Sequence, residues 1–333
     1  MSENFSAEER SLLRGWNTQA EKSEKPDSMR GWYPVVVRKQ KLWWRFFGEK
    51  RFSEPFFHDT VSNLDREKRM CRQTPFEALD KFNEVLAPDA FIFHLSRCGS
   101  TLLTQMLATL PSSVVMSEPP VVDSFLSLHH AFPRQSGAEM ALRKIIAALG
   151  QKRFGEERHF FIKLASWHID SLPLFRQAFP DTPFIFLYRT PNEVLRSHQR
   201  QRGPQMVQGL VDSALLQLDP RPLAPGDLDG YCIKVLSHFL DSACRHSKEL
   251  ILLNYTQLPQ IIWSNFLGFF SISPTPSELE AMQARSGLHS KHGMQFEGDP
   301  PPTVHIDDER CAELYPYYEK LERLRQEQAL FRS

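Results

Sequence analysis

From residue 90 onward, short apolar runs alternate with longer segments of helical composition. The runs cover residues 90–95, 114–116, 160–164, 183–188 and 249–254. Runs of this length without polar alternation are typical of parallel strands buried on both faces. Strands that alternate with helices are in turn typical of a parallel sheet. We therefore predict an α/β fold, with a parallel sheet that carries helices on both faces.

The first 88 residues differ from the rest of the chain. They contain four of the six tryptophans, and the stretch GWYPVVVRKQKLWWRFFGEKRFSEPFFHDT is dense in aromatic and β-branched side chains. This pattern predicts two or three short strands or a hairpin, followed by a helix over about 75–86. Because so short a segment cannot bury that many rings alone, we expect residues 1–88 to be an aromatic-rich N-terminal extension or subdomain. Residues 89–306 then form the main domain, and residues 307–333 form a charged C-terminal helix.

The composition excludes several classes of protein. The chain has 333 residues, and its 40 Lys and Arg are balanced by 40 Asp and Glu. A general nucleic-acid-binding protein would carry a basic surplus, so we expect no nucleic-acid partner. No apolar run reaches 18 residues and the N-terminus has no apolar core, so we expect no membrane span and no signal peptide. The five scattered cysteines form no CxxC pair, which favours a reduced cytoplasmic protein without structural zinc.

The first chemical motif is the turn between the first apolar run and the helix after it. The first amides of a helix have no partner within the helix, and the helix dipole makes this end attractive to anions. Gly99 allows a sharp turn, Ser100 and Thr101 add hydroxyl groups, and Arg97 adds a guanidinium that matches oxyanion geometry. The motif therefore predicts a phosphate or sulfate site. The alternative is a strand–helix turn that is merely capped by serine.

The same loop differs from the Walker A motif of ATP-hydrolysing enzymes. It has no leading glycine, and Gly99 stands where that motif has lysine. The run 183–188 has no acidic residue at its end to hold magnesium, so ATP hydrolysis of the usual type is disfavoured. A kinase-like or other P-loop transferase, or a non-catalytic phosphate-binding protein, are the alternative functions. Cys98 is either a space-filler or a thiolate activated at a helix N-terminus, and we favour the space-filler.

The second chemical motif follows the fourth apolar run. Thr190 and Glu193 fit a capping box, and Pro191 fits the first helical position, so a helix should begin there. Arg189 then lies at the carboxyl end of a strand, and Ser197 lies about two helical turns further on. Ligands of open α/β sheets bind at the carboxyl ends of the strands, so both motifs should open onto one rim.

Together the two motifs resemble those of the PAPS-dependent sulfotransferase family (PAPS is 3′-phosphoadenosine 5′-phosphosulfate). FIFHLSRCGSTLL resembles the loop for the 5′-phosphosulfate, in the RSGST form of bacterial and Golgi members. LYRTPNEVLRS resembles the 3′-phosphate motif, in which an arginine and a serine eight residues later bind that phosphate. LLNYTQLP and Leu267-Gly268-Phe269 resemble later family segments. Residues 290–299, in the long polar loop 286–303, resemble a loop that folds over the cofactor.

The resemblance covers about residues 90–300 and implies a P-loop nucleotide-binding fold with PAPS as co-substrate and no metal. The residues that it implies for binding PAPS are Arg97, Cys98, Gly99, Ser100, Thr101, Arg189 and Ser197. The implied reaction is in-line transfer of a sulfuryl group to the hydroxyl or amine of a small-molecule, glycan or peptide acceptor. Arg97 would also act in catalysis, by stabilising the leaving phosphate. The sequence leaves the acceptor and the oligomeric state open.

Two residues are candidates for the base that takes the acceptor's proton. Glu118 follows the second apolar run, and its flanking prolines should keep the chain extended so that the carboxylate faces the crevice. His168 follows the third run and is the alternative. A base needs hydrogen-bond reach to the acceptor and a suitable pKa, so both remain open. Lys163, in the third run, is expected either to contact the donor or acceptor or, as is more common for a lysine at a strand end, to be solvated.

Overall fold

The computed structural model describes residues 29–288 and 309–328, except residues 40, 66–69, 134–135, 212, 219–223 and 225. Its centre is a five-stranded sheet in the order β5-β6-β4-β7-β8, and every neighbouring pair is parallel. The strands are β4 (Ala90–His94), β5 (Ser113–Ser117), β6 (His159–Lys163), β7 (Phe184–Tyr188) and β8 (Ile251–Asn254). The predicted parallel sheet is therefore confirmed, strand by strand.

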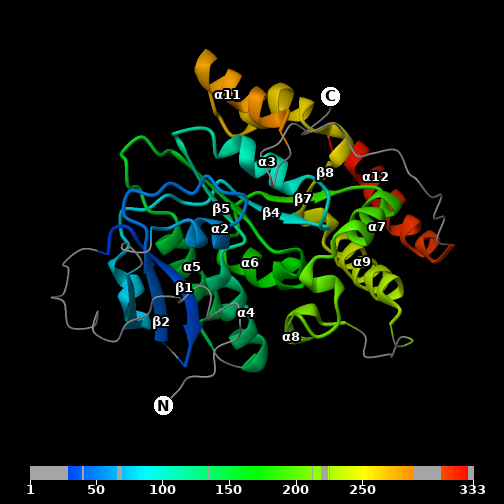
Figure 1. Cartoon of the computed structure of the whole chain (residues 1–333), viewed down its shortest axis with the longest axis horizontal. Helices are drawn as coiled ribbons and strands as arrows, with labels where there is room; N and C mark the ends of the chain where they lie inside the picture. Colours follow the sequence, from blue (N-terminus) through cyan, green and yellow to red (C-terminus); the bar gives the residue numbers. More distant parts are fainter. Residues whose placement is uncertain are drawn as a thin grey trace.

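Helices cover the sheet on both sides, as predicted. Figure 1 shows α3 and α11 on one side of the sheet and α5 and α6 on the other. The helices are α2 (Phe57–Ser62), α3 (Ser100–Leu107), α4 (Pro120–Ala131), α5 (Ala138–Leu149), α6 (Leu172–Ala178), α7 (Pro191–Arg200), α8 (Ser213–Leu216), α9 (Leu228–Arg245), α10 (Leu267–Phe269), α11 (Pro276–Ser286) and α12 (Tyr315–Glu327). Shorter turns of helix are η3 (Phe76–Lys81), η4 (Ser166–Ser171), η5 (Pro204–Met206), η6 (Ser247–Glu249), η7 (Tyr255–Gln257), η8 (Ile262–Phe266) and η9 (Glu309–Leu314).

The N-terminal extension contains a separate antiparallel sheet. Its strands are β1 (Trp32–Arg38), β2 (Lys41–Phe46) and β3 (Cys71–Pro75), in that order. The predicted strands are confirmed, but the helix predicted over 75–86 is wrong in length. The chain leaves the helical path at Phe82, because Val85 bridges Gln151 and the amide of Leu86 donates to the carbonyl of Gly150 at 2.7 Å.

The extension packs on α4 and α5 of the main domain. The amide of Val37 donates to Ser124 Oγ at 2.9 Å. The Gln151 side chain accepts from the amide of Gly31 at 2.9 Å and donates to the carbonyl of Trp32 at 2.7 Å. The aromatic rings of the extension are thus buried against α4 and α5 of the main domain, as the number of these rings led us to expect.

Of the helix predicted over 307–333, residues 309–328 are described, and they contain η9 and α12. The Gln328 side chain lies against the edge strand β8, where it accepts from the amide of Leu252 at 2.9 Å and donates to the carbonyl of Leu250 at 2.8 Å. This contact satisfies backbone groups that the sheet edge would otherwise leave exposed. The proposed cofactor loop at 290–299 lies outside the described residues. Within the described ranges, no helix has the length and apolarity to cross a membrane.

Candidate active site

The loop between β4 and α3 is sharply folded. Ser96, Arg97 and Gly99 have φ angles of 77°, 51° and 87°, which is the left-handed region. For residues other than glycine this conformation costs about 1–3 kcal/mol each and persists only where surrounding contacts hold it. Here the amide of Ser96 donates to His94 Nδ1 at 3.0 Å, and Ser96 Oγ accepts from Gln205 Nε2 at 2.9 Å. The loop is therefore preformed and leads directly into the N-terminus of α3.

Gly99 has two reasons to be glycine. Its φ of 87° is unfavourable for residues with a Cβ. A Cβ at this position would also lie 2.6 Å from Cδ2 of Tyr255, a residue that follows β8. The ring of Tyr255 therefore lies directly against the loop. Sequence reasoning missed this contact, although Tyr255 lies within a segment that resembles the sulfotransferase family.

The side chains of the loop point in different directions. The thiol of Cys98 is fully buried and donates to the carbonyl of Leu187 at 3.1 Å, and burial raises its pKa to about 11. This burial fits the space-filling role of Cys98, which stays a prediction. The half-buried Arg97 donates to the backbone carbonyl and, at 3.2 Å, to the Oε1 of Gln201, directly after α7. Arg97 therefore links the first motif to the helix of the second.

The second motif lies at the same edge of the sheet, because β4 and β7 are neighbours. Arg189 is only 8% exposed; its Nη2 lies 2.8 Å from Glu193 Oε1, and its guanidinium lies 4.2 Å from the centre of the Tyr255 ring. The half-buried Ser197 lies on α7. That helix begins at Pro191 as predicted. The capping box is wrong, because the Thr190 hydroxyl donates to the Glu193 carboxylate instead of capping a backbone amide.

Lys163, at the end of β6, is fully buried, so the expectation that it is solvated is wrong. Its Nζ lies 2.9 Å from Glu118 Oε1, 3.2 Å from Thr101 Oγ1 and 4.3 Å from the centre of the Phe56 ring. Thr101 belongs to the first motif, Glu118 follows β5 and Phe56 comes from the N-terminal extension. One buried ammonium thus joins three parts of the chain at the carboxyl edge of the sheet.

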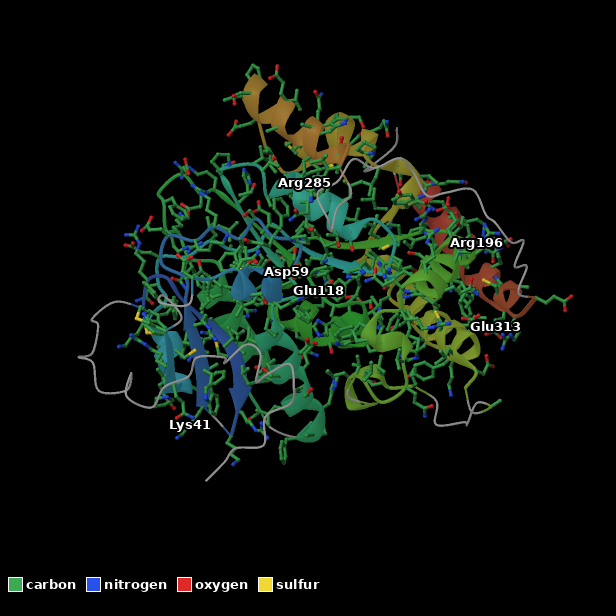
Figure 2. The ribbon with its side chains drawn as sticks, viewed as in Figure 1. Lys41, Asp59, Glu118, Arg196, Arg285 and Glu313 are labelled. Atoms are coloured by element: carbon green, nitrogen blue, oxygen red, sulfur yellow. The ribbon has the colours of Figure 1, made fainter. Side chains whose placement is uncertain are left out.

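Glu118 differs from its prediction in backbone conformation. Its φ is 54°, so it is not extended, and its amide donates to the carbonyl of Lys163 at 2.7 Å. Burial alone would raise the pKa of Glu118, but Lys163 and His94 outweigh it and hold this pKa well below its usual range. The carboxylate is therefore charged and a weak proton acceptor while Lys163 pairs with it. Figure 2 shows Glu118 near the centre of the molecule, with Arg196 and Glu313 toward its outer edge.

His168 belongs to another cluster. It is 1% exposed, and its Nε2 lies 2.5 Å from Asp123 Oδ1, which also accepts from Trp167 Nε1 at 2.8 Å. His168 Nδ1 accepts from the amide of Ala165 at 3.3 Å. Both ring nitrogens of His168 are thus engaged within the fold, whereas Glu118 is connected through Lys163 to the loop before α3.

Sequence reasoning also missed His94, the last residue of β4. Its Nε2 lies 3.5 Å from Glu118 Oε1, and burial lowers its pKa. Two sequence signals could have found this cluster. His94 and Lys163 each lie next to last in an otherwise apolar run, and a lysine is almost never fully buried unless it is paired. The carboxyl ends of neighbouring strands are where those partners can meet.

Neither the family models nor the curated proteins contain a match to this chain. The fold is similar to a sulfotransferase from Alicyclobacillus acidocaldarius, at 13% identity and a TM-score of 0.39, over 73% of this chain and 97% of that one. It is also similar to the sulfotransferase domain of the Synechococcus PCC 7002 olefin synthase (15% identity, TM-score 0.38, 74% and 95% covered). A Mycobacterium avium sulfotransferase gives 13% identity and a TM-score of 0.43, with 75% and 77% covered. At this level of similarity, function has to be argued from the residues of the site.

Proposed function

We propose that the chain is a sulfotransferase that moves a sulfuryl group from PAPS to an acceptor hydroxyl or amine. One observation carries this proposal: the two motifs that are predicted to bind anions lie against the same aromatic ring. The Arg189 guanidinium lies 4.2 Å from the centre of the Tyr255 ring, and the same ring occupies the space that a Cβ at Gly99 would take. A nucleotide with phosphates at both its 5′ and 3′ positions needs two such motifs side by side, and the resemblance to the sulfotransferase motifs supports the same donor.

The residues of the loop fit the phosphosulfate end of such a donor. The first amides of α3 and the hydroxyls of Ser100 and Thr101 would bind its oxygens, with Arg97 as a further cation. Cys98 would contribute only its backbone amide, since its thiol is buried. Arg189 and Ser197 would bind the 3′-phosphate and so select PAPS over donors that lack it.

For the transfer itself, the chain would supply positioning and electrostatic stabilisation. The bond from sulfur to the bridging oxygen breaks as a bond from sulfur to the acceptor oxygen or nitrogen forms. The α3 amides and Arg97 would stabilise the charge left on the phosphate. Lys163 would add to this, because its ammonium already contacts Thr101 at 3.2 Å.

Glu118 is our proposed base for the acceptor's proton, and His168 is the alternative. The link from Glu118 through Lys163 to Thr101 of the first loop supports it, and the two hydrogen bonds of His168 within the fold count against the alternative. Because the pair with Lys163 makes Glu118 a weak proton acceptor, Lys163 would have to leave Glu118 for the leaving phosphate before Glu118 takes the proton. Glu118→Gln should then retain binding of 3′,5′-diphosphoadenosine (PAP) and lower turnover by about 10²–10⁴-fold. If turnover is normal in Glu118→Gln and is lost in His168→Asn, His168 is the base instead.

The proposed function is tested by thermal unfolding with PAP, with 5′-AMP and with ATP plus magnesium. A ligand at 100 times its dissociation constant stabilises a protein by about 2.7 kcal/mol, which raises the melting temperature measurably. We expect a shift with PAP that needs no metal and exceeds the shift with 5′-AMP. A shift with ATP and magnesium alone would favour a kinase-like transferase, and no shift at all would count against any nucleotide donor.

A further inference from the structure

The C-terminal helix α12 places one carboxylate at the ends of two strands of the main sheet. Glu322 Oε1 accepts from the Tyr188 hydroxyl at 2.5 Å and from Asn254 Nδ2 at 2.8 Å. Arg325 Nη2 lies 2.8 Å from the other oxygen, Oε2. Tyr188 ends β7 and Asn254 ends β8, and both are at most 1% exposed. Glu322, whose side chain is 21% exposed, therefore joins two buried strand ends through hydrogen bonds.

The ionisation states of Tyr188 and Glu322 keep the hydrogen bond between them in place. Burial and the hydrogen bond to Glu322 raise the pKa of Tyr188, so its hydroxyl stays protonated and donates. Burial alone would raise the pKa of Glu322, but its bonds from Arg325, Tyr188 and Asn254 lower it overall, so it stays an acceptor. Hydrogen bonds to an ionised acceptor are shorter and stronger than neutral ones.

Each of the two strand ends is followed at once by a residue of the proposed donor site. Arg189 follows Tyr188, and Tyr255 follows Asn254. These two next residues contact each other, with the guanidinium 4.2 Å from the ring centre, and the ring of Tyr255 also packs on Gly99. A displacement of either strand end would therefore move Arg189 relative to the loop before α3.

We propose that Glu322 is a positioning residue for the 3′-phosphate end of the donor site. By tying the ends of β7 and β8 together, it holds Arg189 on Tyr255 at the separation from the first loop that a 3′,5′-diphosphonucleotide requires. The proposal rests on the proposed function. A purely structural role would instead stabilise the docked helix, which is also held by the contact of Gln328 with β8.

Three variants separate these roles. Glu322→Ala removes the link, Glu322→Gln keeps an acceptor oxygen of the same shape, and Glu319→Ala is a control at an exposed position of the same helix. Calorimetry gives the affinities for PAP and 5′-AMP. Hydrogen exchange of the free protein, well below its melting temperature, compares residues 187–190 and 253–258 with strand β6.

We expect Glu322→Ala to weaken PAP binding about tenfold or more, since small displacements of a binding group have large effects. Binding of 5′-AMP should change less than twofold, because its phosphate uses the first loop. Exchange should rise in the two strand-end segments and not in β6. Glu322→Gln should recover most of both properties, and Glu319→Ala should match the wild type.

Two results would overturn the proposal. One is an equal loss of PAP and 5′-AMP affinity in Glu322→Ala, and the other is exchange that rises uniformly with the fall in melting temperature. If the wild-type protein shows no preference for PAP, the proposed function fails. The exchange data then still decide whether Glu322 holds the strand ends, and the 3′-phosphate assignment is withdrawn with the function.

Discussion

Two cation–carboxylate pairs lie at the carboxyl edge of the sheet, and they differ in burial and in reach. Lys163 is fully buried and pairs with Glu118, 45 residues earlier, whose side chain is 23% exposed. Arg189 pairs with Glu193, four residues later in the first turn of α7, whose side chain is 41% exposed. The first pair joins two strand ends, whereas the second is local and only its carboxylate is open to solvent. We therefore expect the first to contribute more to the stability of the fold, and the second to yield to an arriving anion.

The sharpest way to break the first pair is Lys163→Met. It leaves Glu118 charged and partly buried without its main partner, and breaking a buried pair costs about 3–5 kcal/mol. The matched control is Lys144→Met, because Lys144 pairs with Asp80 at 2.6 Å with both side chains exposed. Such surface pairs contribute about 0–1 kcal/mol. Urea unfolding measures both variants, and equal losses would contradict the distinction that we draw.

The second pair is tested by Arg189→Ala. This change removes charge-assisted hydrogen bonds to the 3′-phosphate, which contribute about 1.5–3 kcal/mol, or roughly ten- to hundredfold in affinity. It should affect PAP far more than 5′-AMP, and the melting temperature little. Calorimetric titration of both nucleotides measures the effect. An equal loss for the two ligands would remove Arg189 from the 3′-phosphate site.

The pH dependence of stability distinguishes the pairs further. The pKa of Glu118 is held below 4.5, so its pair stabilises the fold above that pH and loses its effect only as the pH falls through the lower folded value. In Lys163→Met, the ammonium that lowers the pKa of Glu118 is gone while burial still raises it, so this pKa should rise. The difference in free energy of unfolding between this variant and the wild type should then become smaller as the pH falls from 7 to 5. It should shrink by about 1.4 kcal/mol for each unit by which the folded-state pKa of Glu118 exceeds its unfolded value. If this difference stays constant with pH, Glu118 is not the group that Lys163→Met leaves without a partner.

The contrast between the pairs also explains what the sequence could predict. The strands, the sharp loop and Arg189 were predictable because each depends on local pattern: an apolar run, a glycine turn, an arginine after a strand. His94 was missed and Lys163 was expected to be solvated, because their partners come from other strands and local pattern does not give strand order. Glu118 was placed correctly at a strand end but in the wrong backbone conformation, because the bond from its amide to Lys163 outweighs the preference that Pro119 imposes.

The smallest expected effect comes from Glu193→Gln. The Glu193 carboxylate neutralises Arg189 in the free protein and would repel an incoming 3′-phosphate, whereas glutamine can still accept a hydrogen bond from Arg189. Because glutamine keeps that hydrogen bond and the Glu193 side chain is largely exposed, stability should change by less than about 1 kcal/mol. PAP should bind about threefold more tightly, with 5′-AMP unchanged, as calorimetry at fixed ionic strength can measure. Weaker PAP binding would show instead that the carboxylate is needed to orient Arg189. The Arg189–Glu193 pair would then hold its cation in place, as the Lys163–Glu118 pair does.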